Sequence, residues 1–168
     1  ANALKKLGQN YEVFSDVQRI QDFDKLILPG VGAAAPAMAK LKKLGFAEEL
    51  PELRMPILGI CLGLQLFADF SFEGNTDCLG IIPGKVQKFT NDLKVPQIGW
   101  NKVDFVGSSL LFEGIPNDSY FYFVNSFYFD SENFVIGRTP YGIKFPSVLR
   151  KNNFYAVQFH PEKSGKIG

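Results

Sequence analysis

The sequence predicts an α/β fold: a three-layer sandwich with a central, mostly parallel sheet to which antiparallel strands are added. Three observations support this prediction. Apolar runs typical of buried strands alternate with helical patterns in the first half of the chain. Short strand-like runs separated by turn residues fill the second half. The length of 168 residues, 46% of them hydrophobic, matches one domain with a substantial core.

In the first half of the chain, predicted strands and helices alternate. Residues 24–28 end in three apolar side chains and residues 57–60 are an uninterrupted apolar run, so both are expected to be buried strands. The first run stops at the turn-forming sequence Pro29-Gly30-Val31-Gly32. Helices are expected over residues 3–7, 36–50 and 62–70, and one further short strand over residues 11–14. Parallel strands joined by helices form a sheet that is covered on both faces.

The second half is expected to consist mainly of short strands. These cover residues 85–89, 95–98, 101–105, 120–124, 134–138, 147–150 and 154–159. Turn residues separate them at Pro83-Gly84, Asn91-Asp92, Asn117-Asp118 and Asn152-Asn153. The turn at Asn152-Asn153 is short enough to close a hairpin. We therefore expect antiparallel strands beside the parallel core.

Composition excludes several classes of function. The net charge is +1 and the basic residues are scattered, so neither nucleic acid nor an anionic membrane is an expected partner. No apolar run approaches the roughly 20 residues that span a bilayer, and the N-terminus has no signal-peptide pattern. Two cysteines, Cys61 and Cys78, and a single His160 are too few for a disulfide framework or a structural zinc site. We expect a cytoplasmic protein without a metal or cofactor.

No internal repeat, linker or low-complexity segment divides the chain. It begins at Ala1 within a helical pattern and ends at Gly168 without a terminating element. We therefore expect residues 1–168 to be a single domain that is truncated at both ends.

A candidate nucleophile lies between the strand at residues 57–60 and the helix that follows. The run Gly59-Ile60-Cys61-Leu62-Gly63 has the form of a nucleophile elbow with Cys in place of Ser. So tight a turn requires small residues two positions before and two positions after the nucleophile. The start of a helix also favours a thiolate over a thiol. The alternative is a simple buried cysteine, which is the role expected for Cys78.

A candidate base follows the last predicted strand. His160-Pro161-Glu162 comes directly after residues 154–159, and Pro161 fixes the backbone between the two polar residues. A carboxylate bonded to one imidazole nitrogen leaves the other nitrogen free to take a thiol proton. The alternative is a surface histidine paired with a glutamate. Because the ends of parallel strands assemble such sites, Cys61, His160 and Glu162 form a candidate triad.

Four segments together resemble the class I glutamine amidotransferases and, within that superfamily, the glutaminase subunits of imidazole glycerol phosphate synthase. They are residues 28–32 (Leu-Pro-Gly-Val-Gly), 59–66 (Gly-Ile-Cys-Leu-Gly-Leu-Gln-Leu), 95–101 (Val-Pro-Gln-Ile-Gly-Trp-Asn) and 157–165 (Val-Gln-Phe-His-Pro-Glu-Lys-Ser-Gly). The resemblance covers nearly the whole chain, and the segment at 95–101 is the more specific one. It implies the flavodoxin-like fold of that family and the hydrolysis of glutamine to glutamate and ammonia.

The resemblance also assigns roles to residues around the candidate triad. Backbone N–H groups of Leu62 and of the loop Gly30-Val31-Gly32, above all that of Val31, would bind the oxyanion. Gly32, Gln65 and the backbone of Ser126 and Phe127 would surround bound glutamine. The alternatives are ordinary turn chemistry for the glycines and an exposed helical position for Gln65.

The partner implied by the resemblance is a (βα)8-barrel cyclase. In that family the cyclase receives the ammonia through its core and makes imidazole glycerol phosphate and AICAR in histidine biosynthesis. The residues implied at this interface are Trp100, Asn101, Tyr122 and Lys163. The alternatives are core packing for the two aromatic side chains and a solvated charge for the lysine. A mobile oxyanion loop would let the partner switch activity on, so we expect the isolated subunit to be nearly inactive.

Two positions depart from the family pattern, and neither belongs to the triad. Gln97 and Asn125 stand where the family usually has His, so glutamine hydrolysis is expected to survive. A glutaminase subunit for another synthase, such as one that builds amidinated surface sugars, is therefore a competing interpretation. A cysteine hydrolase or peptidase and a non-catalytic binding subunit on the same scaffold are two further ones. The Gly-Trp-Asn and Glu-Lys-Ser-Gly segments argue against the hydrolase or peptidase, and the intact Cys, His and Glu argue against the binding subunit.

Overall fold

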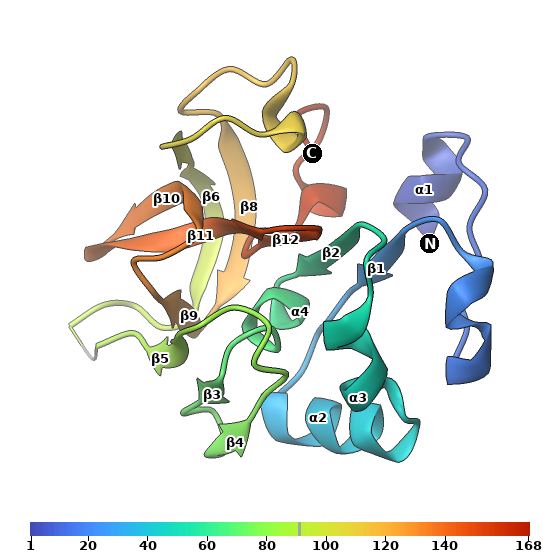
Figure 1. The fold of residues 1–168 in the computed structure, drawn as a ribbon. Helices are drawn as coiled ribbons and strands as arrows, with labels where there is room; N and C mark the ends of the chain where they lie inside the picture. Colours follow the sequence, from blue (N-terminus) through green and yellow to red (C-terminus); the bar gives the residue numbers. More distant parts are fainter. Residues whose placement is uncertain (91) are drawn as a thin grey trace.

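The computed structural model describes residues 1–90 and 92–168 of the chain. Within them, strands from distant parts of the sequence form a six-stranded sheet in the order β1-β2-β12-β11-β10-β7 (Figure 1). Their bounds are Leu26–Leu28 (β1), Ile57–Ile60 (β2), Phe154–Val157 (β12), Ile143–Lys151 (β11), Val135–Tyr141 (β10) and Asp104–Phe105 (β7). The strands β1, β2 and β12 pair in parallel, and the remaining pairs are antiparallel. The predicted parallel core with added antiparallel strands is confirmed, but the sheet is mixed rather than mostly parallel, since three of its five strand pairs are antiparallel.

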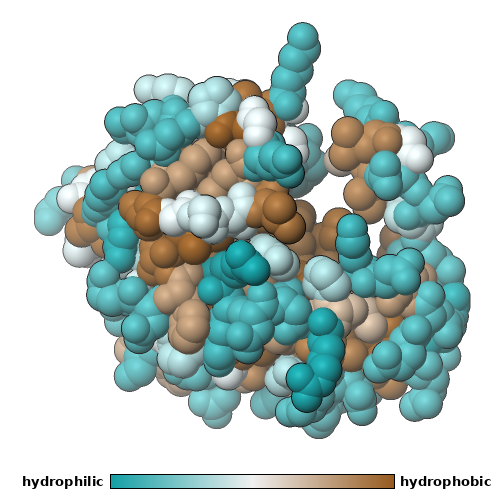
Figure 2. Space-filling view, turned by 45° about the horizontal axis from the view of Figure 1, so that its top comes forward, coloured by the Kyte–Doolittle hydropathy of each residue, from teal (hydrophilic) through white to brown (hydrophobic). Residues whose placement is uncertain are grey.

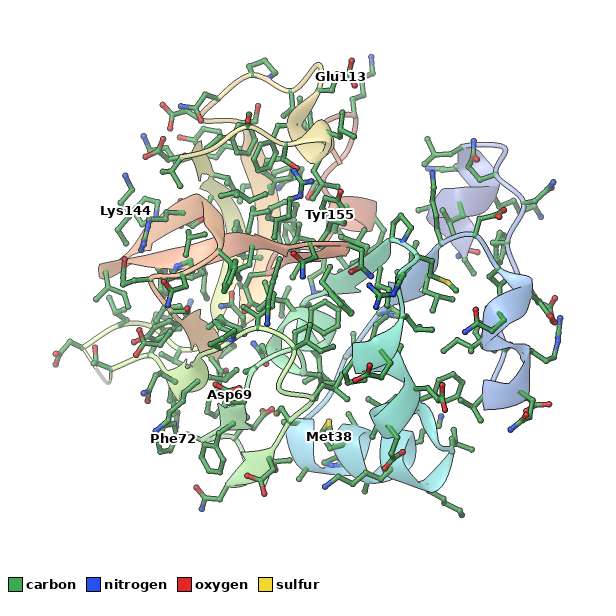
Figure 3. All side chains as sticks on the ribbon, in the orientation of Figure 1. Met38, Asp69, Phe72, Glu113, Lys144 and Tyr155 are labelled. Atoms are coloured by element: carbon green, nitrogen blue, oxygen red, sulfur yellow. The ribbon has the colours of Figure 1, made fainter. Side chains whose placement is uncertain are left out.

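One face of this sheet packs against helices. Along β2 and β12 the side chains alternate between the faces, so that Ile57, Phe154 and Ala156 share a buried cluster with residues of α2 and α3. The helices are Ala34–Lys43 (α2) and Phe46–Glu49 (α3). Met38 of α2 is buried in this cluster (Figure 3). A sheet face that alternates apolar residues in this way is stable only when such a layer covers it.

The opposite face is covered by strands rather than by helices. A two-stranded antiparallel ribbon, β6 (Gln97–Lys102) and β8 (Tyr120–Asn125), contributes Phe121 and Phe123 to a second buried cluster with Val157 and Phe159. The rings of Phe121 and Phe159 stack with centroids 4.0 Å apart. The three layers of the fold are therefore helices, mixed sheet and ribbon. This places β8 next to the chain that leaves β12.

A smaller sheet was not predicted from the sequence. Its strands are, in spatial order, β4 (Thr76–Asp77), β3 (Phe70–Ser71), β5 (Lys85–Lys88) and β9 (Phe127–Asp130). The strand β9 follows β8 after a bend at Ser126, so one apolar stretch of sequence enters two sheets. The strands β3 and β4 have two residues each, too few to give a periodic pattern.

Several predicted elements differ from those in the structure. The predicted strand at residues 11–14 has no regular structure, and the helix predicted over 36–50 is interrupted at Gly45, whose φ is 77°. The helix predicted over 62–70 is the short α4, Leu62–Gln65, because the carbonyls of residues 66–68 accept bonds from the loop at residues 79–82. The strands predicted over 95–98 and 101–105 are the single strand β6 followed by β7.

The remaining predictions concern turns and the N-terminal segment. The hairpin at Asn152-Asn153 is confirmed, since it joins the antiparallel strands β11 and β12. The predicted turn at Asn91 lies outside the described residues. Further short elements are α1 (Asn2–Lys6) and the 3-10 turns Val17–Asp22 (η1), Leu50–Glu52 (η2), Leu110–Phe112 (η3) and Pro161–Lys163 (η4). Figure 2 shows a notch at the surface between the N-terminal part, at the right of the view, and the rest of the molecule.

Candidate active site

Cys61 occupies a strained turn between β2 and α4. Its φ of 53° and ψ of −106° are unusual for a residue with a side chain, and such strain clusters at functional sites. A Cβ atom on Gly63 would lie 1.9 Å from the Leu28 carbonyl oxygen, and one on Gly59 would lie 2.8 Å from the backbone of Gly63. Neither position has room for a side chain, as the elbow pattern requires.

The sulfur of Cys61 lies in a nearly closed environment, with 8% of the residue exposed. The thiol donates to the Val124 carbonyl at 3.8 Å, and the Gln158 Nε2 donates to the sulfur at 3.6 Å. Burial raises the pKa of the thiol to about 11, against smaller opposing effects from the Leu62 backbone N–H and the Gln158 amide. The resting site therefore holds a thiol, and thiolate formation needs further help.

His160 and Glu162 form a bonded pair at the end of β12. The Nδ1 of His160 lies 2.8 Å from the Glu162 Oε1, while the imidazole itself is almost fully buried. Glu162 lies in η4, the 3-10 turn that Pro161 opens directly after the histidine. With the carboxylate as acceptor, Nδ1 carries the proton and Nε2 is the nitrogen left for chemistry.

Backbone hydrogen bonds bring Cys61 and this pair to the same end of the sheet. The N–H of Cys61 donates to the Val157 carbonyl at 2.8 Å, three residues before His160. On β8, the Tyr122 carbonyl accepts from the His160 N–H at 2.9 Å, and the Val124 carbonyl accepts the Cys61 thiol. Tyr122 and Val124 are two residues apart along β8, so their positions are separated by about 7 Å. Among the described residues, the thiol and the imidazole make no direct hydrogen bond in this resting arrangement.

The loop predicted to bind an oxyanion lies against the elbow. A Cβ on Gly30 would lie 2.5 Å from the Leu62 Cβ, so this glycine allows the loop to touch the first residue of α4. Val31 is 85% exposed, and Gly32 has a φ of 108° with open space around its α-carbon. The loop therefore has one end fixed at the elbow and the other free of side-chain obstruction.

Gln65 is buried, which excludes the alternative of an exposed helical residue. Its Nε2 donates to the Phe127 carbonyl and to the Gln158 Oε1, both at 3.1 Å. The Ser126 carbonyl accepts from the Phe89 N–H at 3.1 Å. The structure thus brings Gln65 and Phe127 together beside the elbow, with the Ser126 carbonyl already engaged elsewhere.

Three residues of the site were not identified from the sequence. Val124 and Gln158 contact the sulfur of Cys61. Ser164 accepts from the Tyr122 N–H at 3.0 Å and donates to the His160 carbonyl at 2.7 Å, so it fastens η4 to β8. Gln158 and Ser164 lie in the segment 157–165 that carries the family resemblance, and a strand period of two also places Gln158 on the side of His160. Val124 carried no such signal.

The family of the chain follows from its similarity to known proteins. The sequence model described as "Glutamine amidotransferase class-I" matches residues 1–168. The chain belongs to this family of glutamine amidotransferases. The resemblance recognised in the four sequence segments is thereby confirmed.

Similar curated proteins include imidazole glycerol phosphate synthase subunits from several bacteria. "Imidazole glycerol phosphate synthase subunit HisH" of Pasteurella multocida is 46% identical over 167 residues, which cover 99% of this chain and 84% of that protein. The protein of the same name from Bacteroides fragilis is 47% identical over 169 residues, covering 99% and 86%. "Imidazole glycerol phosphate synthase subunit HisH 1" of Campylobacter jejuni is 45% identical over 176 residues, covering 100% and 88%.

Solved structures agree with the fold of this amidotransferase. "Crystal structure of glutamine amidotransferase" superposes with a TM-score of 0.75 at 21% identity, covering 96% of this chain and 82% of that chain. A glutamine amidotransferase of Thermotoga maritima gives a TM-score of 0.65 at 20% identity, covering 94% and 62%. The predicted α/β fold of the class I amidotransferases is therefore confirmed.

The residues predicted at the partner interface of this amidotransferase lie on and near the β6–β8 ribbon. Trp100 is 55% exposed, which excludes core packing, and its ring meets that of Tyr122 edge-on at 5.9 Å. The Lys163 Nζ lies 6.0 Å from the centre of the Tyr122 ring. Asn101 instead uses its amide within the chain, donating to the Pro140 carbonyl at 2.7 Å. Three of the four residues thus share one exposed surface.

Two further findings concern membrane-spanning helices and metal sites in the described residues. Among them, no helix has the length and apolar character needed to cross a membrane. In the same residues, no group of three or more His, Cys, Asp and Glu side chains is placed to hold a metal ion.

Proposed function

We propose that this chain is the glutaminase subunit of an imidazole glycerol phosphate synthase. It hydrolyses glutamine to glutamate and ammonia and passes the ammonia to a (βα)8-barrel cyclase subunit. The names and the 45–47% identity of the Pasteurella, Bacteroides and Campylobacter relatives support this function. The observation that carries it is the arrangement of Cys61 and the His160–Glu162 pair at one end of the parallel strands β2 and β12.

In the proposed reaction, Cys61 is the nucleophile, His160 the base and acid, and Glu162 the residue that orients the imidazole. The thiol gives its proton to the Nε2 of His160, and the thiolate attacks the side-chain carbonyl of glutamine. The proton then moves to the departing nitrogen, so that ammonia leaves and a glutamyl thioester remains. Water activated by His160 releases glutamate and restores the thiol. Catalytic bonds absent from a resting site are commonly made once substrate is bound.

The oxyanion of the tetrahedral intermediate needs two N–H donors. The Leu62 N–H is the first, since it already acts on the Cys61 sulfur and follows the nucleophile in α4. The Val31 N–H is the second, and it becomes available when the peptide between Gly30 and Gly32 turns over. The open space around Gly32 supports such a movement.

Glutamine is bound beside the elbow. Gln65 and Gly32 border the substrate, together with the backbone of Ser126 and Phe127. The burial of Gln65 and its hydrogen bond to the Phe127 carbonyl support this assignment, because they hold a polar amide in a fixed position next to the elbow. A site that hydrogen-bonds its substrate through fixed groups rejects analogues that lack those groups.

The cyclase docks on the exposed surface formed by Trp100, Tyr122 and Lys163, with Asn101 at its edge. Exposed aromatic residues of this kind frequently dominate binding energy at protein interfaces. Docking here would also bear on catalysis, because the Tyr122 backbone is bonded to His160 and Ser164. A glutaminase that is active only when its partner is bound avoids releasing ammonia into water, where ammonia is protonated and lost.

The experiment that tests this function measures glutamine hydrolysis with and without the (βα)8-barrel cyclase. The wild-type chain should be nearly inactive alone and strongly activated by the cyclase. Cys61→Ala should lose activity by roughly 1000-fold or more, while Cys78→Ala, the matched control, should keep it. Residual turnover in Cys61→Ala close to the wild-type rate would contradict the triad. Activation only by a different synthase would contradict the assignment to imidazole glycerol phosphate.

A further inference from the structure

A chain of buried amide groups ends on the sulfur of Cys61. Gln158, which is fully buried between β12 and His160, donates from Nε2 to the sulfur at 3.6 Å. Its Oε1 accepts from the Nε2 of Gln65 at 3.1 Å. Gln65 in turn donates to the Phe127 carbonyl at 3.1 Å. One continuous path of hydrogen bonds, the amide path, therefore joins Phe127, Gln65, Gln158 and Cys61.

The direction of each bond in this path follows from the chemistry of its groups. The Phe127 carbonyl can only accept, so the amino group of Gln65 must face it. The same amino group then faces the Gln158 side chain, and only the Oε1 of Gln158 can accept from it. This leaves the amino group of Gln158 facing the sulfur. Turning either amide over would bring two acceptors or two donors together.

An N–H directed at sulfur favours the thiolate over the thiol, because hydrogen bonds to an ionised group are stronger than those to a neutral one. The Val124 carbonyl acts in the opposite sense, since it accepts the proton of the neutral thiol. Among charged groups, Glu162 disfavours the thiolate and Lys163 favours it, both from η4, which also follows His160. Burial has removed most water from the sulfur. The Gln158 amide is thus one of few donors that can replace it.

We propose that the Gln158 side chain stabilises the thiolate of Cys61 alongside the Leu62 backbone N–H, and that Gln65 is its positioning residue, which holds the Gln158 N–H on the sulfur of Cys61. The inference rests on the proposed glutaminase function and extends it. The residue that borders glutamine also controls the orientation of the amide at the nucleophile. Substrate contact with Gln65 and ionisation of Cys61 are thereby coupled through a single intervening side chain.

The test is a titration of Cys61 itself, which requires no turnover. The full chain is prepared as Cys78→Ser with cysteine labelled by ¹³C at the β-carbon, so that one NMR signal reports one thiol. In Gln158→Met, which keeps a similar volume without a donor, the pKa of Cys61 should rise by at least one unit. That rise corresponds to about tenfold less thiolate at any pH below the pKa. An unchanged titration in a folded Gln158→Met protein would overturn the proposal.

A second variant keeps the proposal testable if Gln158→Met does not fold. Gln65→Met leaves Gln158 in place but removes the group that orients it, and should raise the same pKa by a smaller amount. Thr139→Val is the matched control, because it removes a buried hydrogen bond to Ser147 on the neighbouring strands β10 and β11 without touching Cys61. A shift in Thr139→Val as large as in the glutamine variants would mean that general loosening is the cause, and would reject the proposal.

The titration also separates this inference from the function on which it rests. The expected shifts in a chain that does not hydrolyse glutamine, even with the cyclase present, would leave the amide path standing and reject the glutaminase. If the chain hydrolyses glutamine normally but the Cys61 pKa is the same in Gln158→Met and Gln65→Met as in the parent protein, the glutaminase function stands and the amide path is rejected.

Discussion

Gln97 and Asn125 lie directly opposite each other in the β6–β8 ribbon, and both are buried. These are the two positions at which the family resemblance led us to expect histidines. The Asn125 Nδ2 donates to the Phe127 carbonyl at 3.0 Å, the same oxygen that accepts from Gln65. The departures are therefore one cross-strand pair that adjoins the amide path to the nucleophile.

The first prediction is that these two positions are energetically coupled. Gln97→Asn leaves a hole and Asn125→Gln overfills the buried space, but the double exchange conserves the total volume. Directly opposed residues have Cβ atoms about 4.5–5.5 Å apart. The double variant should therefore be more stable than the sum of the single effects by about 0.5 kcal/mol or more. Urea denaturation of the four proteins measures this, and strict additivity would show that the two side chains do not share a space.

The sequence predicted the parts of the site that depend on local pattern. The elbow at Cys61 and the pair His160–Glu162 follow from spacing and from the special geometry of glycine and proline. The contacts from β8 do not, because the acceptors there are backbone carbonyls of Tyr122 and Val124, which any residue could supply. Their position depends on the ribbon covering the sheet, a tertiary arrangement that periodicity alone does not contain.

The fold shows the same division between local and tertiary information. The strands β1, β2 and β12 were recognisable as apolar runs, and their pairing follows from the rules of parallel sheets. The burial expected for β1 is only partial, because β1 is an edge strand whose Ile27 is exposed. The end of α4 at Gln65 was not, since it results from carbonyl groups taken up by the loop at residues 79–82. The sequence predicted a sheet covered on both faces, but not that the β6–β8 ribbon would cover one of them.

The second prediction concerns alkaline pH. Burial raises the pKa of the Cys61 thiol from 9.0 to about 11, so the folded state holds this proton more tightly than the unfolded state. The resulting stability is fully present below about pH 9 and is lost as the pH rises to about 11. In a Cys78→Ser background, the free energy of unfolding should therefore fall less steeply over this range in Cys61→Ala. Equal slopes with and without the Cys61 thiol would contradict the assigned burial effect.

The third prediction concerns Ser164, the buried hydroxyl that joins η4 to β8. Ser164→Ala leaves the Tyr122 N–H without its acceptor, which should cost about 1–3 kcal/mol of stability. It should also lower kcat about tenfold, less than the 10²–10⁴-fold contribution of a general base, because His160 is displaced rather than removed. KM for glutamine should stay unchanged, since no substrate contact is lost. Steady-state kinetics with the cyclase would decide this, and a pure KM effect would contradict the positioning role.

The fourth prediction tests the geometry of the elbow. In Gly63→Ala, the new methyl group would lie 1.9 Å from the Leu28 carbonyl oxygen. Relieving this clash requires a shift of the backbone, which costs more free energy than a side-chain rotation. We expect a loss of about 3 kcal/mol or more in stability. Gly107→Ala is the control, because its new Cβ would meet only Ile136 at an ordinary distance of 3.4 Å. Its stability should change by less than about 1 kcal/mol. Comparable losses in the two variants would show that β1 does not confine the elbow.

The fifth prediction concerns the surface on which the cyclase is proposed to dock. Trp100 is more than half exposed and lies against Tyr122, whose backbone holds His160 and Ser164 in place. Trp100→Ala should therefore leave the Tm of the isolated chain nearly unchanged but weaken cyclase binding by about 2 kcal/mol, or roughly 30-fold in Kd. Phe72→Ala provides a matched control, because Phe72 is a similarly exposed aromatic residue at the smaller sheet (Figure 3).

The two aromatic variants separate docking from a general loss of surface hydrophobicity. Calorimetric titration with the cyclase should give a wild-type Kd for Phe72→Ala and a weakened one for Trp100→Ala. Because Tyr122 connects this surface to the proposed catalytic pair His160–Glu162, saturating Trp100→Ala with cyclase should restore most of the glutaminase rate. If binding is unaffected in Trp100→Ala, the cyclase docks elsewhere, and activation must reach His160 by a route that does not begin at the β6–β8 ribbon.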